Sequence, residues 1–472
     1  MLSHFLIEQI RKNFPHEPTT DQAEALEKLS AFMMNPDADS LFLLKGYAGT
    51  GKSSLVGALV KTLTALEQKT VLLAPTGRAA KVFSNYSGHA AFTIHKKIYR
   101  QKKFSHENVG FELNVNLHKH TLFIVDEASM ISNGSYDKAM FGSGHLLDDL
   151  IEYIYTGEGC RLLLMGDSAQ LPPVGESISP AFDMNVLKAF GLNVETFTLT
   201  QVIRQQLTSG ILKNATDIRT LITEEKAGLY PKIRIKNYPD IIRLRGDELI
   251  EAVSSAYNRS GIEETTVISR SNKRANIYNN GIRNSILYRE EELSGGDMLM
   301  VVKNNYYWSE EYAEIDFIAN GDIAKVNRVR RYEEMYGFRF ADVNMTLLDY
   351  DIDIDVKILL DTLHSETASL SQEQTGKLFY AILEDYEDIP GKAGKIRKIK
   401  QNPHYNCLQV KYGYALTCHK AQGGQWKNVF LDMGYLSNEH LGIDFYRWLY
   451  TAFTRATEKL YLINLSEEMI EE

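Results

Sequence analysis

Eight consecutive residues have the types and spacing of a phosphate-binding loop. Residues 46–53 are Gly-Tyr-Ala-Gly-Thr-Gly-Lys-Ser, which fits the pattern G-x-x-x-x-G-K-[ST]. Glycines let backbone N–H groups close around phosphates, Lys52 would neutralise the β and γ charges, and Ser53 would place its hydroxyl on Mg²⁺. The predicted contacts of a bound nucleotide are Gly46, Ala48, Gly49, Thr50, Gly51, Lys52, Ser53 and Ser54.

Two adjacent carboxylates supply the second half of this chemistry. Asp126 and Glu127 directly follow the apolar run 122–125, at the carboxyl end of a predicted buried strand, where ligands of open α/β sheets bind. We expect Asp126 to hold the Mg²⁺ shell, and Glu127 to orient and deprotonate an attacking water. An acidic pair alone is more often a solvated loop, but the phosphate loop upstream favours the catalytic interpretation.

The elements that must position these residues follow from hydrophobic patterning. Apolar runs at 41–44, 71–74, 122–125 and 162–165 alternate with helical patterns, as in a parallel sheet wrapped by helices. After the first run, the apolar residues of 55–63 recur at three- and four-residue spacing, which predicts an amphipathic helix. We therefore expect an α/β domain over residues 1–190, beginning with an amphipathic helix at Met1–Lys12.

A similar pattern returns in two separated pieces, which indicates a second domain interrupted by an insertion. Its apolar runs are 266–269, 429–432, 448–453 and 460–463. The predicted second domain covers 191–290 and 405–472. The insert, 291–404, has the alternation of a small β domain, with a helix predicted at Thr367–Tyr386 and a basic loop at Gly391–Lys400.

Composition excludes several classes of protein. The 472 residues carry 52 Lys and Arg against 61 Asp and Glu, a net charge of -9, which argues against a protein that coats polyanions with its whole surface. Three scattered cysteines exclude a disulfide framework and a cysteine zinc site. Apolar runs are short and no signal peptide is evident, so we expect a soluble, cytoplasmic protein that does not bind membranes.

One segment departs from this acidic average. Residues 68–106 contain eight Lys or Arg and no Asp or Glu. Among their aromatic residues, Phe83, Tyr86, Phe92 and Tyr99 have faces on which bases could stack. A charge run is usually a solvated face, but this one favours contact with nucleic acid.

The motifs in order resemble those of superfamily 1 helicases, in the RecD-like and Dda-like branch. The resemblance rests on G-D-x-x-Q-L-P-P-V at 166–174, after D-E-A-S-M at 126–130, and it extends from Gln22 to Arg455. It implies two RecA-like domains with parallel sheets, the second interrupted by a small Src-homology-like β-barrel. The excursion near 367–400 is similar to the tower of the branch, without a motif of its own.

The resemblance also assigns roles in the nucleotide site. Gln22 would read the adenine of ATP, although Thr20 beside it also fits a helix amino-terminal cap. Gln170, with Asp167, would sense hydrolysis, and Arg204 and Arg455 would reach the γ-phosphate from the second domain. Gln425 stands where many relatives carry a ribose-binding glutamate, which weakens the expectation of ribose selectivity.

Three further motifs resemble those that grip a single strand. They begin at 74, 93 and 415, and the residues they place on nucleic acid are Pro75, Thr76, Arg78, Lys81, Thr93, His95, Lys96, Thr417, His419 and Lys420. For His95, packing inside the protein is an equally good interpretation.

The function implied is an ATP-dependent DNA helicase that moves 5′-to-3′ on single-stranded DNA and unwinds duplex, in replication, repair or recombination. We expect a monomer acting on single-stranded and forked DNA, with single-strand-binding or replication and repair proteins as candidate partners. Alternatives are an ATP-gated strand clamp or the motor subunit of a nuclease complex. A duplex-splitting pin is expected near 97–120, with Phe104 and Phe111 as wedge candidates and an ordinary packed loop as the alternative.

Overall fold

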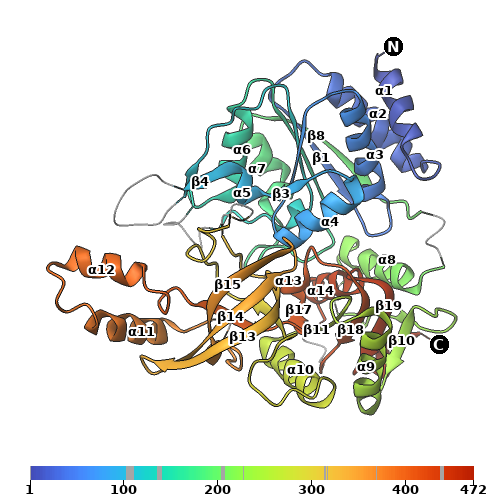
Figure 1. Cartoon of the computed structure of the whole chain (residues 1–472). Helices are drawn as coiled ribbons and strands as arrows, with labels where there is room; N and C mark the ends of the chain where they lie inside the picture. Colours follow the sequence, from blue (N-terminus) through green and yellow to red (C-terminus); the bar gives the residue numbers. More distant parts are fainter. Residues whose placement is uncertain are drawn as a thin grey trace.

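The computed structural model has two sheet-centred lobes and a barrel (Figure 1). It describes residues 2–101, 111–134, 141–203, 208–226, 228–312, 315, 317–367, 369–435 and 441–471. Arg204 and Phe104, two predicted functional residues, lie outside these ranges.

The first lobe is built on a six-stranded parallel sheet in the order β3-β2-β6-β7-β1-β8. Its strands are β1 (Ser40–Gly46), β2 (Thr70–Ala74), β3 (Ala91–Thr93), β6 (Leu122–Val125), β7 (Arg161–Gly166) and β8 (Asn193–Leu199). Alternate residues of β1 enter two separate cores, Leu41 and Leu43 one, Phe42 and Leu44 the other. The strand is therefore apolar throughout because both faces of the sheet are covered by helices.

Helices α1 (Leu2–Lys12), α2 (Thr20–Met34) and α3 (Lys52–Ala65) pack on one face of this sheet. On the other face lie α5 (Ile94–Ile98), α6 (Leu146–Tyr155) and α7 (Met184–Ala189). The expected amino-terminal helix is confirmed by α1. The remaining elements of the lobe are α4 (Gly77–Ser87), the antiparallel pair β4 (Tyr99–Gln101) and β5 (Phe111–Leu113), and the short turns η1 (Ala128–Met130) and η2 (Pro180–Phe182).

The second lobe has a five-stranded parallel sheet in the order β10-β19-β18-β11-β17. The strands are β10 (Ile241–Leu244), β11 (Thr265–Ser269), β17 (Ala415–Thr417), β18 (Trp426–Asp432) and β19 (Ala456–Ile463). Its helices are α8 (Gly210–Thr223), α9 (Leu249–Ser260), α10 (Asn272–Ser285), α13 (Cys418–Ala421) and α14 (Ile443–Phe453), with η4 (Gly246–Glu248) and η7 (Glu467–Met469). A small pair, β9 (Ile233–Arg234) and β20 (Ile470–Glu471), lies apart from this sheet.

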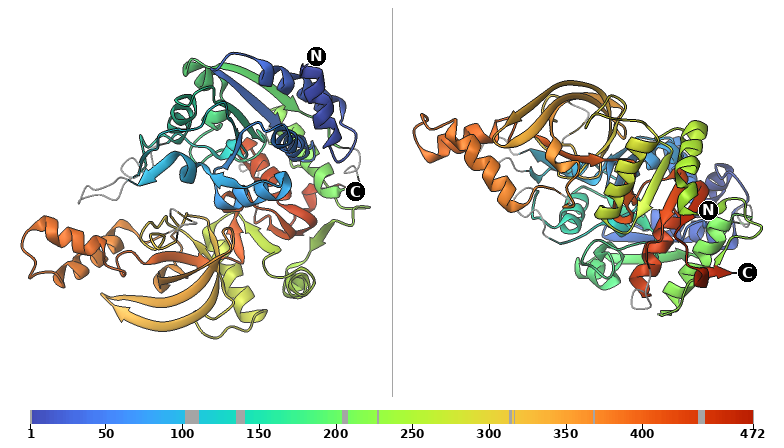
Figure 2. Two further views of the ribbon diagram at one scale, coloured as in Figure 1. Left: turned by 45° about the horizontal axis from the view of Figure 1, so that its top comes forward. Right: turned by 90° about the horizontal axis from the view of Figure 1, so that it is seen from below.

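A closed five-stranded barrel interrupts the second lobe. Its strands are β12 (Met298–Val301), β13 (Ile323–Met335), β14 (Phe338–Leu347), β15 (Ile352–Leu359) and β16 (Leu408–Tyr412), with η5 (Leu360–Thr362) after β15. Helices α11 (Gln372–Glu384) and α12 (Lys392–Lys400) form an excursion that projects from the barrel, away from the second lobe's sheet (Figure 2). The predicted fold class, α/β with two parallel-sheet domains and a β-barrel insert, is confirmed.

Three details differ from the sequence-based expectations. Strand β8 pairs with β1, so the first sheet continues past residue 190, and β16 closes the barrel beyond residue 404. Residues 392–400, predicted as a loop, form α12, because Ile399 is buried in an apolar cluster with α11 despite the lysine-rich composition.

No helix within the described ranges has the length and apolar content that a bilayer crossing requires.

Candidate nucleotide cleft and strand groove

The phosphate loop is preformed between β1 and α3. Gly49 and Gly51 have φ values of 75° and 79°, a left-handed conformation that side chains disfavour, which explains the glycines. The Lys52 ammonium donates to the backbone oxygen of Gly46 and, at 3.3 Å, to that of Tyr47. The lysine therefore rests on carbonyls of its own loop, next to the cavity where phosphates would sit.

A cavity of about 400 Å³ lies over this loop and is lined by both lobes. Of the predicted nucleotide-site residues it collects Ala48, Gly49, Gly51, Lys52, Ser53, Ser54, Asp126, Glu127, Gln170, Gln425 and Arg455. Gly46, Thr50 and Gln22 do not line it. Residues more than 400 positions apart thus meet in one cleft, which we call the nucleotide cleft.

Gln22 lies behind the loop rather than in the cleft. Its side chain is fully buried, and Nε2 donates to the Thr50 carbonyl oxygen at 2.9 Å while Oε1 accepts from the N–H of Thr19. The helix cap is Thr19, one residue before the predicted Thr20, because Thr19 Oγ1 accepts from the N–H of Gln22. The glutamine thus ties α2 to the phosphate loop.

The two carboxylates are held at the end of β6. Asp126 accepts from the Tyr86 hydroxyl at 2.8 Å and from the N–H of Glu127 at 2.7 Å, and burial raises the pKa of Asp126. Glu127 has a φ of 52°, a left-handed backbone conformation directly after the strand, and lines the cleft. Burial, with the charge of Asp126 next, raises the pKa of Glu127 to about 7, a value suited to a general base.

Asp167 and Gln170 form the base of the cleft. Asp167 is 1% exposed and accepts from the N–H of Ala169 at 2.9 Å and from the Tyr450 hydroxyl at 2.6 Å. In the part of the chain that the structure describes, the buried Oε1 of Gln170 has no hydrogen-bond partner. An unsatisfied buried amide facing a cavity indicates a polar ligand.

Arg455 lies at the far wall of the cleft and is held by the second lobe. Its guanidinium donates to the carbonyl oxygens of Thr451 and Gly424 at 3.1 and 3.2 Å, and the side chain is 3% exposed. A further arginine of that lobe, Arg219, lies 4.4 Å from the centre of the Tyr47 ring. Arg219 and the hydroxyls of Tyr86 and Tyr450 were not predicted for this site. Arg219 and Tyr86 belong to no motif of the nucleotide site, and in the motif of residues 450–456 a role was predicted for Arg455 alone.

A second cavity, of about 260 Å³, collects the strand motifs, and we call it the strand groove. Of the predicted strand contacts it is lined by Pro75, Thr76, Arg78, Thr93, His95, His419 and Lys420; Lys81, Lys96 and Thr417 lie outside its lining. The barrel and the segments beside it add Asn304, Phe317, Ala319, Asn320, Gly321, Asp322 and Asp349. Three distant parts of the chain therefore build one groove.

Two carboxyl groups of the barrel, Asp322 and Asp349, line the groove together with its cations. Burial, with the charge of Asp349 next, raises the pKa of Asp322 to about 8. Burial also lowers the pKa of Lys420 to about 8, and the Lys420 ammonium donates to Asn320 Oδ1. His95 packs against the rings of Tyr99, Phe141 and Phe317, and its burial lowers its pKa to about 4, which favours the neutral form.

Arg78 and Lys81 make contacts between parts of the protein. The Arg78 guanidinium lies 3.9 Å from the centre of the Trp426 ring in the second lobe, and Lys81 Nζ donates to the carbonyl oxygen of Leu348 next to the barrel. Thr76 and Thr93 use their hydroxyls to cap α4 and α5. Helix α4 is thereby joined to both neighbours at the groove.

The predicted base-stacking aromatics are mostly internal. Phe83 and Tyr99 are buried and Tyr86 stacks on Phe83, because each side chain faces a core; Phe92 is 38% exposed. Phe111, a wedge candidate, is 6% exposed and stacks on Phe141 at 4.8 Å, which agrees with the packed-loop alternative.

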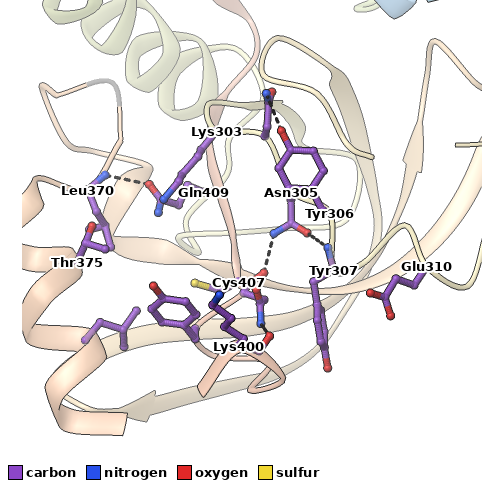
Figure 3. Close-up of a pocket in the computed structure, with 14 residues that line it drawn as sticks. Lys303, Asn305, Tyr306, Tyr307, Glu310, Leu370, Thr375, Lys400, Cys407 and Gln409 are labelled. Atoms are coloured by element: carbon purple, nitrogen blue, oxygen red, sulfur yellow. Dashed lines mark hydrogen bonds between the residues drawn. The ribbon is translucent and has the colours of Figure 1, made fainter. Parts of the chain in front are cut away.

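A third cavity, of about 340 Å³, lies between the barrel and the helical excursion (Figure 3). Asn305 braces one wall by donating to the Asn406 carbonyl oxygen at 2.7 Å, and Gln409 accepts from the N–H of Leu370 at 2.9 Å. The cavity adjoins the strand groove, because Asn304 lines both.

Comparison with known proteins finds two matching domain models and several similar helicases. An AAA domain model matches residues 18–232, and a UvrD-like helicase C-terminal domain model matches residues 412–463. The ATP-dependent RecD2 DNA helicase of Deinococcus radiodurans is 24% identical over 93% of this chain and 48% of its own length. The ATP-dependent DNA helicase Dda of Enterobacteria phage T4 is 26% identical over 55% of each chain.

The chain thus spans about half the length of each of these two relatives. A solved structure from a study of DNA unwinding at forked duplexes by two Pif1 helicases covers 96% of this chain and 94% of its own, at 15% identity and a TM-score of 0.49. The first matched domain covers most of the first lobe and extends into α8, the second falls on the second lobe, and the chain is similar to RecD-like and Dda-like helicases of superfamily 1.

Proposed function

We propose that this protein is an ATP-dependent DNA helicase that translocates 5′-to-3′ along single-stranded DNA and separates duplex ahead of it. The main support is that the nucleotide cleft and the strand groove are both built from both lobes. A change in the distance between the lobes that accompanies ATP turnover therefore also changes the groove.

In this proposal the first lobe binds the phosphates and activates water. Lys52 leaves its two carbonyl partners to meet the β- and γ-phosphates, together with the loop N–H groups. Glu127 accepts the proton of the attacking water. The hydroxyl of Ser53, which is exposed to the cleft, and the Asp126 carboxylate form an oxygen donor set that fits Mg²⁺, which would neutralise phosphate charge.

The second lobe completes the charge stabilisation when the cleft closes. Arg455 exchanges its bonds to Thr451 and Gly424 for the γ-phosphate, and Arg204 is the second proposed contact. Gly424 follows α13, which carries His419 and Lys420 of the groove. Release of the Gly424 carbonyl oxygen by Arg455 therefore links hydrolysis to the grip on the strand.

Stepping follows if the two lobes hold the strand alternately. Thr76 and Thr93 belong to the first lobe, and His419 and Lys420 to the second. We propose the first lobe, extended from residues 1–190 to include β8, and the second lobe as the two motor domains, and the barrel insert, extended from 291–404 to include β16, as the part that covers the strand. The proposed ligands are single-stranded and forked DNA, and the proposed working unit is a monomer.

The test is a forked-duplex assay with each tail polarity. We expect unwinding to need ATP and a 5′ single-stranded tail, and we expect single-stranded DNA to stimulate ATP hydrolysis. Equal or better unwinding from a 3′ tail would contradict the polarity. Stimulated hydrolysis without strand separation would favour the clamp, and cleavage of the DNA by the purified chain would favour the nuclease motor.

A further inference from the structure

We propose that Tyr450 is a positioning residue that joins the phosphate loop and Asp167 to α14, the helix that ends shortly before Arg455, and thereby sets the catalytic alignment of the two lobes. This inference deepens the proposed function and rests on its ATPase half, without requiring that the protein unwinds DNA. The observation behind it is a single buried hydroxyl from the second lobe that bonds to two separate elements of the first.

The geometry of this junction is specific. The backbone N–H of Ala48, inside the phosphate loop, donates to the Tyr450 hydroxyl at 2.8 Å, and that hydroxyl donates to Asp167 Oδ2 at 2.6 Å. Tyr450 is 1% exposed and lies on α14. A phenol has one proton to donate and lone pairs to accept with, so these two bonds use the hydroxyl as donor and acceptor at once.

The surroundings keep this hydroxyl protonated. Burial, followed by the charge of Asp167, raises the pKa of Tyr450 well above its ordinary value. The phenol therefore remains a donor to Asp167 at any pH at which the protein works. Asp167 in turn accepts from the N–H of Ala169, so the junction is continuous with the segment that carries Gln170.

Neighbouring contacts attach the same segment to the second lobe. The N–H of Leu171 donates to Thr451 Oγ1 at 2.9 Å, and Gln422 Nε2 donates to the Leu171 carbonyl oxygen at 2.8 Å. Residues 167–171 are thus held by α14 and by the chain after α13. Arg455 follows the end of α14 directly, so the placement of this helix fixes where the arginine lies relative to Glu127.

A nucleotide in the cleft can affect the second lobe through Tyr450 as well as through Arg455. Ala48 and Asp167 border the phosphate site, and both are hydrogen-bonded to the Tyr450 hydroxyl on α14. Without the hydroxyl, the nucleotide can still bind through Lys52 and the loop. The alignment of Arg455 with the water-activating carboxylate would be lost, so kcat should change more than KM.

The experiment compares Tyr450→Phe with Tyr446→Phe in the full chain. Tyr446 is one turn earlier on α14, fully buried, and its hydroxyl also accepts from one backbone group and donates to another, the N–H and carbonyl oxygen of Leu229 at 3.0 and 2.8 Å. Both variants remove one buried hydroxyl with two bonds, so a similar loss of thermal stability is expected. Leu229, the partner of Tyr446, does not line the cleft, whereas Ala48 and Asp167, the partners of Tyr450, both do, which makes Tyr446→Phe the matched control.

We expect Tyr450→Phe to lower the kcat of DNA-stimulated ATP hydrolysis about tenfold, because leaving a buried polar group unpaired costs about that factor. The KM for ATP should change by less than about twofold. Tyr446→Phe should keep both constants near wild type. Asp167→Asn should cause a similar fall in kcat, and the double variant Tyr450→Phe/Asp167→Asn should be far from additive.

Equal kcat losses in Tyr450→Phe and Tyr446→Phe, or an unchanged kcat in Tyr450→Phe, would overturn the inference. If Tyr450→Phe does not fold, the kcat and KM of Asp167→Asn decide, with unchanged kcat as the contradicting result. A wild-type protein that hydrolyses ATP but fails the forked-duplex assay would contradict the proposed function alone, because the kinetic comparison still applies.

Discussion

The nucleotide cleft and the strand groove differ in how their charged groups are held. In the cleft, the proposed catalytic groups are already bonded to other protein groups: Lys52 to loop carbonyls, Asp126 to Tyr86, and Arg455 to Thr451 and Gly424. The groove is lined by the cation Lys420 and by two carboxyl groups of the barrel, Asp322 and Asp349. The cleft holds its charged groups in place before ATP binds, whereas the charge of the groove depends on the protonation of Lys420 and Asp322.

This difference suits the two proposed tasks. A site that stabilises a transition state gains from fixed, preorganised dipoles. A site that must release a strand at every step gains from moderate affinity, and carboxylates near the phosphates limit the affinity. The groove therefore should respond to single charge changes by smaller factors than the cleft.

The sharpest separation of the two regions is expected from Lys52→Ala. Loss of the ammonium removes charge stabilisation from the phosphates, so kcat for ATP hydrolysis should fall on the order of 10²- to 10³-fold. Affinity for a fluorescent single-stranded oligonucleotide, measured by anisotropy without nucleotide, should stay within about twofold, because Lys52 does not line the groove.

Lys61→Ala is the control, since Lys61 lies on the same helix and is exposed. It should leave both quantities unchanged. Wild-type hydrolysis by Lys52→Ala would refute the phosphate-loop assignment.

The cleft was also the region that the sequence predicted better, for a physical reason. The residues of a phosphate loop and of a strand end are neighbours along the chain, so local backbone geometry places them. The contacts missed are long-range: Tyr86 meets Asp126 across 40 positions, and Tyr450 meets Ala48 across 402. Side-chain hydroxyls of this kind leave no trace in spacing or periodicity.

The groove was predicted only in part because the barrel supplies one of its walls. Seven motif residues line it as expected, but Asp322 and Asp349 belong to an insert without a motif. The stacking role failed for Phe83, Tyr86 and Tyr99 because aromatic residues do not reveal from sequence whether they face a core or solvent. Similarly, the lysine-rich composition of residues 392–400 led to the prediction of a loop, but these residues form α12, which packs through one buried isoleucine.

In the groove, Lys420→Met should weaken single-strand binding on the order of tenfold. The slope of log affinity against log salt concentration should become shallower by about the amount that one phosphate contact contributes. Basal ATP hydrolysis without DNA should be retained. Lys427→Met is the control, because Lys427 lies on β18 and does not line the groove. An unchanged salt dependence in Lys420→Met would remove Lys420 from the strand path.

The balance of charges in the groove predicts a pH dependence. As pH rises from 7 to 9, Lys420, with its pKa lowered to about 8, loses its positive charge, while Asp322, with its pKa raised to about 8, becomes negative. Both changes weaken phosphate binding, so strand affinity at constant ionic strength should fall roughly fivefold. Burial lowers the pKa of His419, so this neighbour is neutral over the same interval.

Asp322→Asn should remove part of this pH dependence and raise affinity at pH 9, whereas Asp388→Asn, an exposed position outside the groove, should not. Strand affinity that rises between pH 7 and 9 would contradict the assignment of these two groups.

The smallest expected effect concerns Gln425, which is exposed to the nucleotide cleft and which the sequence resemblance places at the ribose of ATP. A neutral amide accepts a weaker hydrogen bond from a ribose hydroxyl than a carboxylate does, by about 1 kcal/mol or less. The wild type should therefore discriminate ATP from dATP weakly, and Gln425→Glu should raise the ratio of their kcat/KM values about threefold. Gln425→Ala should bring that ratio close to one. An ATP-to-dATP ratio of kcat/KM values that is equal in all three proteins would place the ribose away from Gln425. The difference between the cleft and the groove would then depend only on the residues that contact the phosphates.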